Sequence, residues 1–233
     1  MLGLNTVIGQ TGVVINEAPT TGGKWIRAKG VYTFLLYSAK ANICHTDIEN
    51  RLTGTGTEWG SVTIDLTKTN LITASVSVDA PITALLPCGA PQVSFSILSS
   101  SDILVNQAIR LNGRQPGRVE KTTSGGHGIN IKLRAGANGK ILMLAPVENS
   151  GANGSNAMLA DQKGGNGGNS GYVYLKAPGG ILMPQNVTSN AGKGGLGKGA
   201  GRKGENGKFG LLNIQDGVAS RVKNGSFKNK NSL

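Results

Sequence analysis

The chain has 233 residues, of which 37 are glycine, 15% are charged and 4% are aromatic. This length suits one large β domain or two smaller ones, the low charge excludes a charge-rich disordered tail, and the scarcity of aromatics argues against one large core. The formal net charge of +12, from 24 Lys+Arg against 12 Asp+Glu, favours a polyanionic partner such as nucleic acid, lipopolysaccharide or an acidic protein surface.

The part of the chain before residue 125 has the pattern of short strands. Polar and apolar residues alternate at 61–67, 71–80 and 93–98, and residues 31–37 form a continuous β-prone run. Several short runs of period two, bounded by Gly, Pro and Asn, are typical of antiparallel sheets. We therefore predict an N-terminal antiparallel β-sandwich over residues 1–124 that serves as an attachment domain. Residues 39–52 are expected to form a loop or one short helix.

The composition changes near Gly125. Residues 125–210 contain 23 glycines, where average usage would give about six. Short apolar segments alternate with glycine blocks, and such loosely spaced repeats favour stacked layers. The segments expected to be strands are 129–135, 140–147, 171–178, 180–185 and 209–215.

Glycines in these blocks recur at every third residue, as at Gly165, Gly168 and Gly171 and again from Gly201 to Gly210. A polyproline-II-type helix also turns every three residues, so these glycines would leave one face without side chains, where neighbouring backbones can meet. Collagen is excluded because the blocks lack proline. For residues 125–215 we predict a polyglycine-II helix bundle or β-solenoid-like layers within an all-β protein. A flexible linker at 193–208 stays an alternative, and residues 216–233 are expected to be a basic tail.

Enzymatic motifs in the sequence are incomplete. Residues 192–198 match G-x-x-x-x-G-K, but Gly199 replaces the required Ser or Thr, and no helix-forming segment follows. The two cysteines, Cys44 and Cys88, form no C-x-x-C motif and have no paired spacing, and together with the two histidines they do not readily supply a zinc site. We therefore expect no catalytic activity, no cofactor and no metal. No apolar run approaches 18 residues, so no membrane insertion is expected.

The alternation of strands with glycine blocks, as in GYVYLKAPGG at 171–180 and NAGKGGLGKGAG at 190–201, resembles the glycine-rich tip domains of tailed-bacteriophage tail-fibre adhesins. The stretch GGKWIRAKGVYTFLLYSAKA at 22–41 is similar to the tryptophan–glycine–valine strand motif that often precedes such domains. The resemblance covers about residues 22–40 and 125–215. It implies a β-rich base on the fibre and loops presented to an outer-membrane protein or lipopolysaccharide. In this chain the glycine runs are shorter, and they carry lysine where those tips often carry aromatics.

The resemblance implies a virion tail adhesin that binds a bacterial surface receptor, contacts other virion proteins and forms a homo-oligomer. A purely structural virion component, such as a baseplate, fibre-connector or capsid-decoration protein, is the alternative. Nucleic acid is the least favoured partner because few aromatics are present for base stacking. The expected receptor contacts are Lys193, Lys198, Arg202, Lys203, Lys208, Tyr172 and Tyr174.

Overall fold

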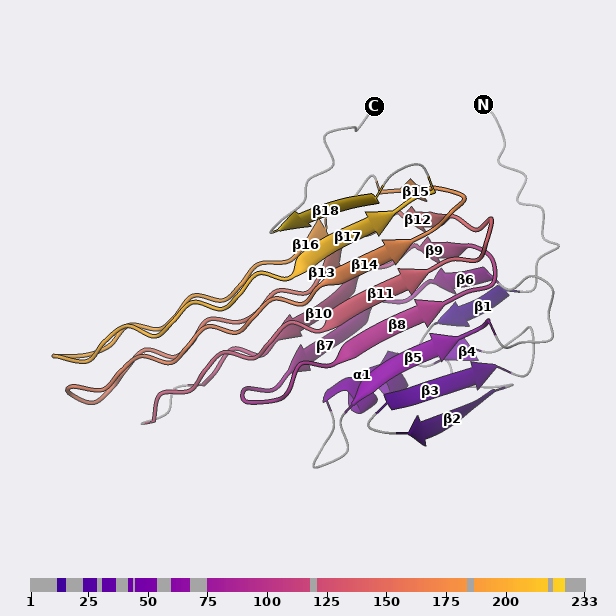
Figure 1. The fold of residues 1–233 in the computed structure, drawn as a ribbon. Helices are drawn as coiled ribbons and strands as arrows, with labels where there is room; N and C mark the ends of the chain where they lie inside the picture. The colour runs from indigo at the N-terminus through magenta and orange to yellow at the C-terminus, as the bar shows by residue number, and fades with distance from the viewer. Residues whose placement is uncertain are drawn as a thin grey trace, which may run out of the picture.

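The computed structural model describes residues 12–15, 23–28, 31–36, 42–43, 45–53, 60–67, 75–117, 121–183, 187–217 and 220–224. Within them the chain winds through three sheets that are built mainly of parallel strands (Figure 1). The single helix of the described residues, α1 (His45–Thr53), precedes the winding part. It is too short and too polar to cross a membrane.

Each of the three sheets joins strands that are far apart in the sequence. In hydrogen-bonded order, the 6-stranded sheet contains β15 (Ile181–Leu182), β12 (Ile141–Met143), β9 (Ile103–Val105), β6 (Ser75–Val78), β1 (Gly12–Ile15) and β4 (Asn42–Ile43). The 4-stranded sheet contains β16 (Val187–Thr188), β13 (Val147–Glu148), β10 (Ile109–Gly113) and β7 (Ile82–Leu86). The 8-stranded sheet contains β18 (Ser220–Asn224), β17 (Leu211–Gln215), β14 (Val173–Lys176), β11 (Asn130–Arg134), β8 (Ser94–Leu98), β5 (Ser61–Asp65), β3 (Val31–Leu36) and β2 (Gly23–Ala28).

The chain visits the three sheets in a fixed order, which produces successive coils like those of a parallel β-helix. Strands β5, β6 and β7 form one coil, and β8 to β10, β11 to β13 and β14 to β16 form the next three. Each strand pairs in parallel with its counterpart in the neighbouring coil. The antiparallel pairs among the described strands are β2 with β3 and β17 with β18.

The core consists of apolar side chains that stack from coil to coil inside the three sheets. One row in the 8-stranded sheet is fully buried or nearly so and runs through Val62, Phe95, Ile131, Val173 and Leu212. Because alternate residues of a strand point to opposite faces, every second residue joins such a row while its neighbours face outward. The period of two in the sequence therefore marks the inner face of each coil.

Helix α1 covers the core beside the first coil. It contacts β7 and β5, and its Ile48 and Leu52 are completely buried. These two residues are four apart and thus lie on one face of the helix. The short helix expected as one of two alternatives within residues 39–52 is therefore present, although it begins at His45.

The predicted fold class is wrong in its antiparallel β-sandwich. Strands β5 and β8 both occur where the alternation placed them, but they pair in parallel, with Val62 opposite Phe95. Period two shows that a strand has one buried face and one solvated face. A coil with one face toward the core has the same pattern as an antiparallel sandwich, so the alternation cannot distinguish the two. Strands of the same sheets also lie on both sides of residue 124.

Three glycine-rich excursions leave the coils at the same place. Each departs after a strand of the 4-stranded sheet (β10, β13 or β16) and returns to the next strand of the 8-stranded sheet (β11, β14 or β17). Figure 1 shows them projecting side by side, far beyond the sheets. We call residues 114–117, 121–129, 149–172 and 189–210 together the glycine bundle. Each excursion has an outgoing and a returning segment, and we call each such segment an arm.

Candidate functional site

Backbone hydrogen bonds join the arms of the glycine bundle at intervals of three residues. The N–H groups of Gly165, Gly168 and Gly171 donate to the carbonyls of residues 155, 152 and 149 at 2.7–2.9 Å. Gly192 and Gly195 donate to the arm that holds Gly168 and Gly165, both at 2.8 Å. The period of three in the sequence thus reappears as a period of three in donors and acceptors, as expected for three-residue turns.

The interior of the bundle has no room for side chains. A Cβ atom built on Gly168 would lie 2.0 Å from the carbonyl oxygen of Gly126, and one built on Gly204 would lie 2.0 Å from that of Gly165. Both obstacles are backbone atoms of other arms, which cannot rotate away. Glycine is therefore required at these positions because the arms lie so close together that a larger residue would separate them.

Asparagine side chains supply a second set of bonds on the outside of the bundle. Oδ1 of Asn153 accepts from the N–H of Lys193 at 2.8 Å, and Oδ1 of Asn156 accepts from the N–H of Leu196 at 2.8 Å. In the next pair of arms, Asn166 and Asn169 serve the N–H groups of residues 205 and 208 in the same way. The N–H groups of these four residues are thereby satisfied, and the arms are held as an ordered body.

The far end of the second excursion contacts the far end of the third. Asp161 has a positive φ of 57°, and its Oδ1 accepts from the N–H of Ala200 at 2.8 Å. Nζ of Lys198 donates to the carbonyl of Met158 at 2.7 Å. Exposed apolar side chains lie close in sequence to these groups, with Met158 48%, Leu159 56% and Leu196 61% exposed. We call residues 157–162 and 196–203 the bundle tip.

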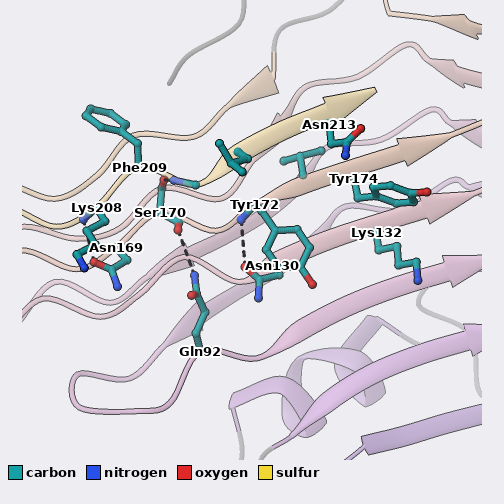
Figure 2. A pocket seen from close by; sticks show the side chains of 13 residues that line it. Gln92, Asn130, Lys132, Asn169, Ser170, Tyr172, Tyr174, Lys208, Phe209 and Asn213 are labelled. Atoms are coloured by element: carbon teal, nitrogen blue, oxygen red, sulfur yellow. Dashed lines mark hydrogen bonds between the residues drawn. The ribbon is translucent and has the colours of Figure 1, made fainter. Parts of the chain in front are cut away.

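The structure divides the predicted contact residues between two places. Lys193, Lys198, Arg202 and Lys203 are exposed on the glycine bundle, the last three of them at the bundle tip. Lys208, Tyr172 and Tyr174 lie instead where the bundle joins the 8-stranded sheet, and all three line one groove (Figure 2). The residues that the sequence grouped as one set of contacts therefore lie at two separate places in the structure.

The groove has a volume of about 520 Å³ and runs over the outer face of the 8-stranded sheet. Tyr172, Phe209 and Leu211 provide its apolar surface and are 43%, 59% and 50% exposed. Figure 2 shows Lys208 toward one end and Lys132 toward the other, with Tyr172 between them. The remaining lining residues are Gln92, Asn130, Asn169, Ser170, Val173, Tyr174, Gly210 and Asn213.

Strand register places the groove residues in rows across the sheet. Lys132, Tyr174 and Asn213 occupy equivalent positions on β11, β14 and β17, and Nζ of Lys132 lies 5.7 Å from the centre of the Tyr174 ring. Asn130 fixes the backbone of the groove at Tyr172, because its Oδ1 accepts a hydrogen bond from the N–H of Tyr172 at 3.0 Å. Nε2 of Gln92 donates to the carbonyl of Ser170 at 3.1 Å and so ties the loop before β8 to the glycine bundle.

Several groove residues were missed by sequence reasoning, namely Gln92, Asn130, Lys132, Asn169, Phe209 and Asn213. Lys132 and Asn213 are 81 positions apart in the chain, so no local motif can connect them. The detectable signal was the coil repeat itself. Aligning the segments 129–135, 171–178 and 209–215 by their buried residues places the outward residues in the same rows.

The phosphate-loop match at 192–198 lies inside the glycine bundle. The N–H groups of Gly192 and Gly195 already donate to the carbonyls of Gly168 and Gly165 at 2.8 Å, so they are not free to bind a phosphate. Among the described residues, no group of three or more His, Cys, Asp or Glu side chains could hold a metal ion.

Comparison of the chain with protein-family models, with curated proteins and with solved structures gave no significant match. The function is therefore inferred from the glycine bundle, its cationic side chains and the groove.

Proposed function

We propose that this chain is a bacteriophage tail-fibre or tail-tip adhesin whose glycine bundle holds a cationic tip toward a receptor on the host cell surface. The observation that carries this proposal is the bundle itself. It projects far from the coils (Figure 1), yet its arms are tied together by regular backbone and asparagine bonds. A projecting body with this order can present side chains in fixed positions, which lowers the entropic cost of binding.

The chemistry of the arms fits an anionic surface. In the last arm, residues 201–210, two of every three positions face outward. Arg202, Lys203 and Lys208 on this arm are exposed. Glu205 is the acidic residue of that arm, and its carboxylate lies 3.6 Å from Nζ of Lys163. The tip itself contains three basic residues and one acidic residue, Asp161, so its net charge is positive beside the exposed Leu196. Lipopolysaccharide phosphates, or an acidic loop of an outer-membrane protein, would be attracted to it.

The test measures adsorption of the purified protein to a panel of bacterial strains and to their purified lipopolysaccharide. The tip variant combines Lys198→Gln, Arg202→Gln and Lys203→Gln. The control variant combines Arg134→Gln, Lys140→Gln and Lys176→Gln and removes the same charge from the coils. We expect saturable binding to at least one strain, and about a tenfold loss in the tip variant from three lost surface contacts. The control should bind like the unmodified chain.

Equal losses in both variants would indicate attraction by net charge alone and would contradict recognition at the tip. The structural-component alternative makes a different prediction. It requires that no strain binds the protein and that the glycine bundle is buried between neighbouring subunits of the assembled particle. Electron microscopy of the particle, with the bundle labelled at Lys203→Cys, would show this directly.

A further inference from the structure

We propose that the groove on the outer face of the 8-stranded sheet is a binding site for an acidic oligosaccharide, separate from the bundle tip. This inference deepens the proposed adhesin function and rests on it, because it names the chemical class that the groove takes from a cell surface. Three properties of the groove support it: the kinds of side chain that line it, the polar groups that are free, and the charge.

The aromatic surface fits a sugar ring. Tyr172 and Phe209 are both large and exposed and lie on the same groove. A pyranose ring has one face made of C–H groups, which packs against an aromatic ring, while its hydroxyls stay at the edge. Aromatic side chains supply this flat contact at a small cost in conformational entropy because they have few rotatable bonds. The groove volume of about 520 Å³ lies within the usual range for small-ligand sites.

The polar lining fits hydroxyl groups. Amide side chains both donate and accept hydrogen bonds, as sugar hydroxyls do, and the groove contains Gln92, Asn130, Asn169 and Asn213. Asn130 and Gln92 are fixed in place by bonds to backbone groups. Within the described part of the chain, the hydroxyl of Tyr172 forms no hydrogen bond, so it is available to a ligand.

The charge of the groove favours a carboxylate or sulfate on the sugar. Its lining includes Lys132 and Lys208 and no aspartate or glutamate. Nζ of Lys208 has no ion pair or hydrogen bond to any described residue, whereas Lys132 contacts the Tyr174 ring. Placed toward opposite ends of the groove (Figure 2), the two ammonium groups would meet charges carried on separate sugar units.

Single-stranded nucleic acid is the main competitor, because bases also stack on aromatics. It would need a basic track for successive phosphates, and the two lysines of the groove are separated by amides and by Tyr172. The amides instead match a ligand whose polar groups are mostly hydroxyls. An oligothymidine arm in the experiment makes this comparison direct.

The experiment is an array of acidic and neutral oligosaccharides probed with the full chain, followed by calorimetric titration of the best binder and of an oligothymidine. We expect at least one uronate, sialic-acid or sulfated oligosaccharide to bind, and its neutral counterpart to bind about tenfold more weakly, as for the loss of a charged contact. Binding should also weaken as salt is added.

Variants assign the site. Tyr172→Ala should lower affinity about tenfold while Tyr172→Phe retains most of it, because the ring is the main contact. Lys208→Gln should lower affinity for the acidic ligand and leave that for the neutral one unchanged. The control Arg134→Gln lies on the same sheet outside the groove and should have no effect. Because Tyr172 and Lys208 are exposed, unchanged urea midpoints will verify that the variants are folded.

The proposal is overturned if no acidic oligosaccharide binds, if oligothymidine binds more tightly, or if Tyr172→Ala binds normally. These outcomes are separable from failure of the adhesin function. Cell adsorption that depends on the tip variant but not on Tyr172→Ala would retain the adhesin and reject the groove. Oligosaccharide binding by a protein that adsorbs to no cells would retain the groove and reject the adhesin.

Discussion

Replacement of Gly168 by alanine tests whether the glycine bundle is held by backbone contact. Gly168 donates to the carbonyl of Ala152 at 2.7 Å, and its own carbonyl accepts from Gly192 at 2.8 Å. The added Cβ would lie 2.0 Å from the oxygen of Gly126, where ordinary contact begins at 3.4 Å. The arms must therefore separate by more than 1 Å, which is less than the difference between these two distances.

The size of the effect follows from the bonds that this separation weakens. Those of Gly168 to Ala152 and Gly192, and that of Ala152 to Gly126, total about 3 kcal/mol at about 1 kcal/mol each. Overpacking adds about 1–3 kcal/mol, and the stiffer unfolded chain returns about 0.4–1 kcal/mol. The expected net loss in the free energy of unfolding is thus about 3–6 kcal/mol.

Gly117→Ala is the matched control, because a Cβ there meets nothing within 4 Å. It should be neutral or stabilise by up to about 1 kcal/mol. The assay is urea unfolding combined with hydrogen exchange of the amides at Gly165, Gly168 and Gly192. Faster exchange at these amides in Gly168→Ala, with slow exchange retained in Gly117→Ala, is the expected result. Equal midpoints and equal exchange in the two variants would refute the close-contact explanation.

Two further predictions concern the asparagines and the core. Asn153→Ala should cost about 0.5–1 kcal/mol and speed exchange of the Lys193 amide, whereas Asn153→Asp, which keeps an acceptor at the same place, should protect that amide; identical exchange in both would contradict the assigned bond at 2.8 Å. Leu133→Ala, at a completely buried position, should lower the free energy of unfolding by about 2–5 kcal/mol. The same substitution at Leu182, 61% exposed, should cost less than about 0.5 kcal/mol, and similar losses at both sites would show that the coils are not held by their core.

The sequence located strands better than it located their partners. The alternation at 61–67 contains β5 (Ser61–Asp65), because burial of one face leaves a local mark on every second residue. Pairing leaves no such mark. Val62 lies opposite Phe95, 33 residues later, and nothing near either residue shows that they are neighbours. Strand β16 (Val187–Thr188) lies in none of the predicted segments, because its two residues are too few for an alternation to repeat.

The two parts of the candidate site differed in the same way. The glycines at every third residue could be read directly, because their spacing is local in the sequence, although the clash that each one avoids is with another arm. The groove could not, because Lys132, Tyr174 and Asn213 meet only through the register of three strands. Tyr172, Tyr174 and Lys208 were selected from the sequence for their chemistry. Their meeting place depends on the junction between coils and bundle, which composition does not reveal.

The three-residue spacing of the hydrogen bonds between arms also limits how the projecting arms can change in length. Adding three residues to an arm extends it by about 9 Å and keeps its glycines facing inward, since each residue of such a helix rises about 3.1 Å. Adding one or two would turn a side chain toward the carbonyls that now accept from Gly165 and Gly168. The length of the bundle can therefore change only by whole three-residue turns that are added to or removed from neighbouring arms together. The outward residues of each turn, in contrast, can be replaced without any change in length.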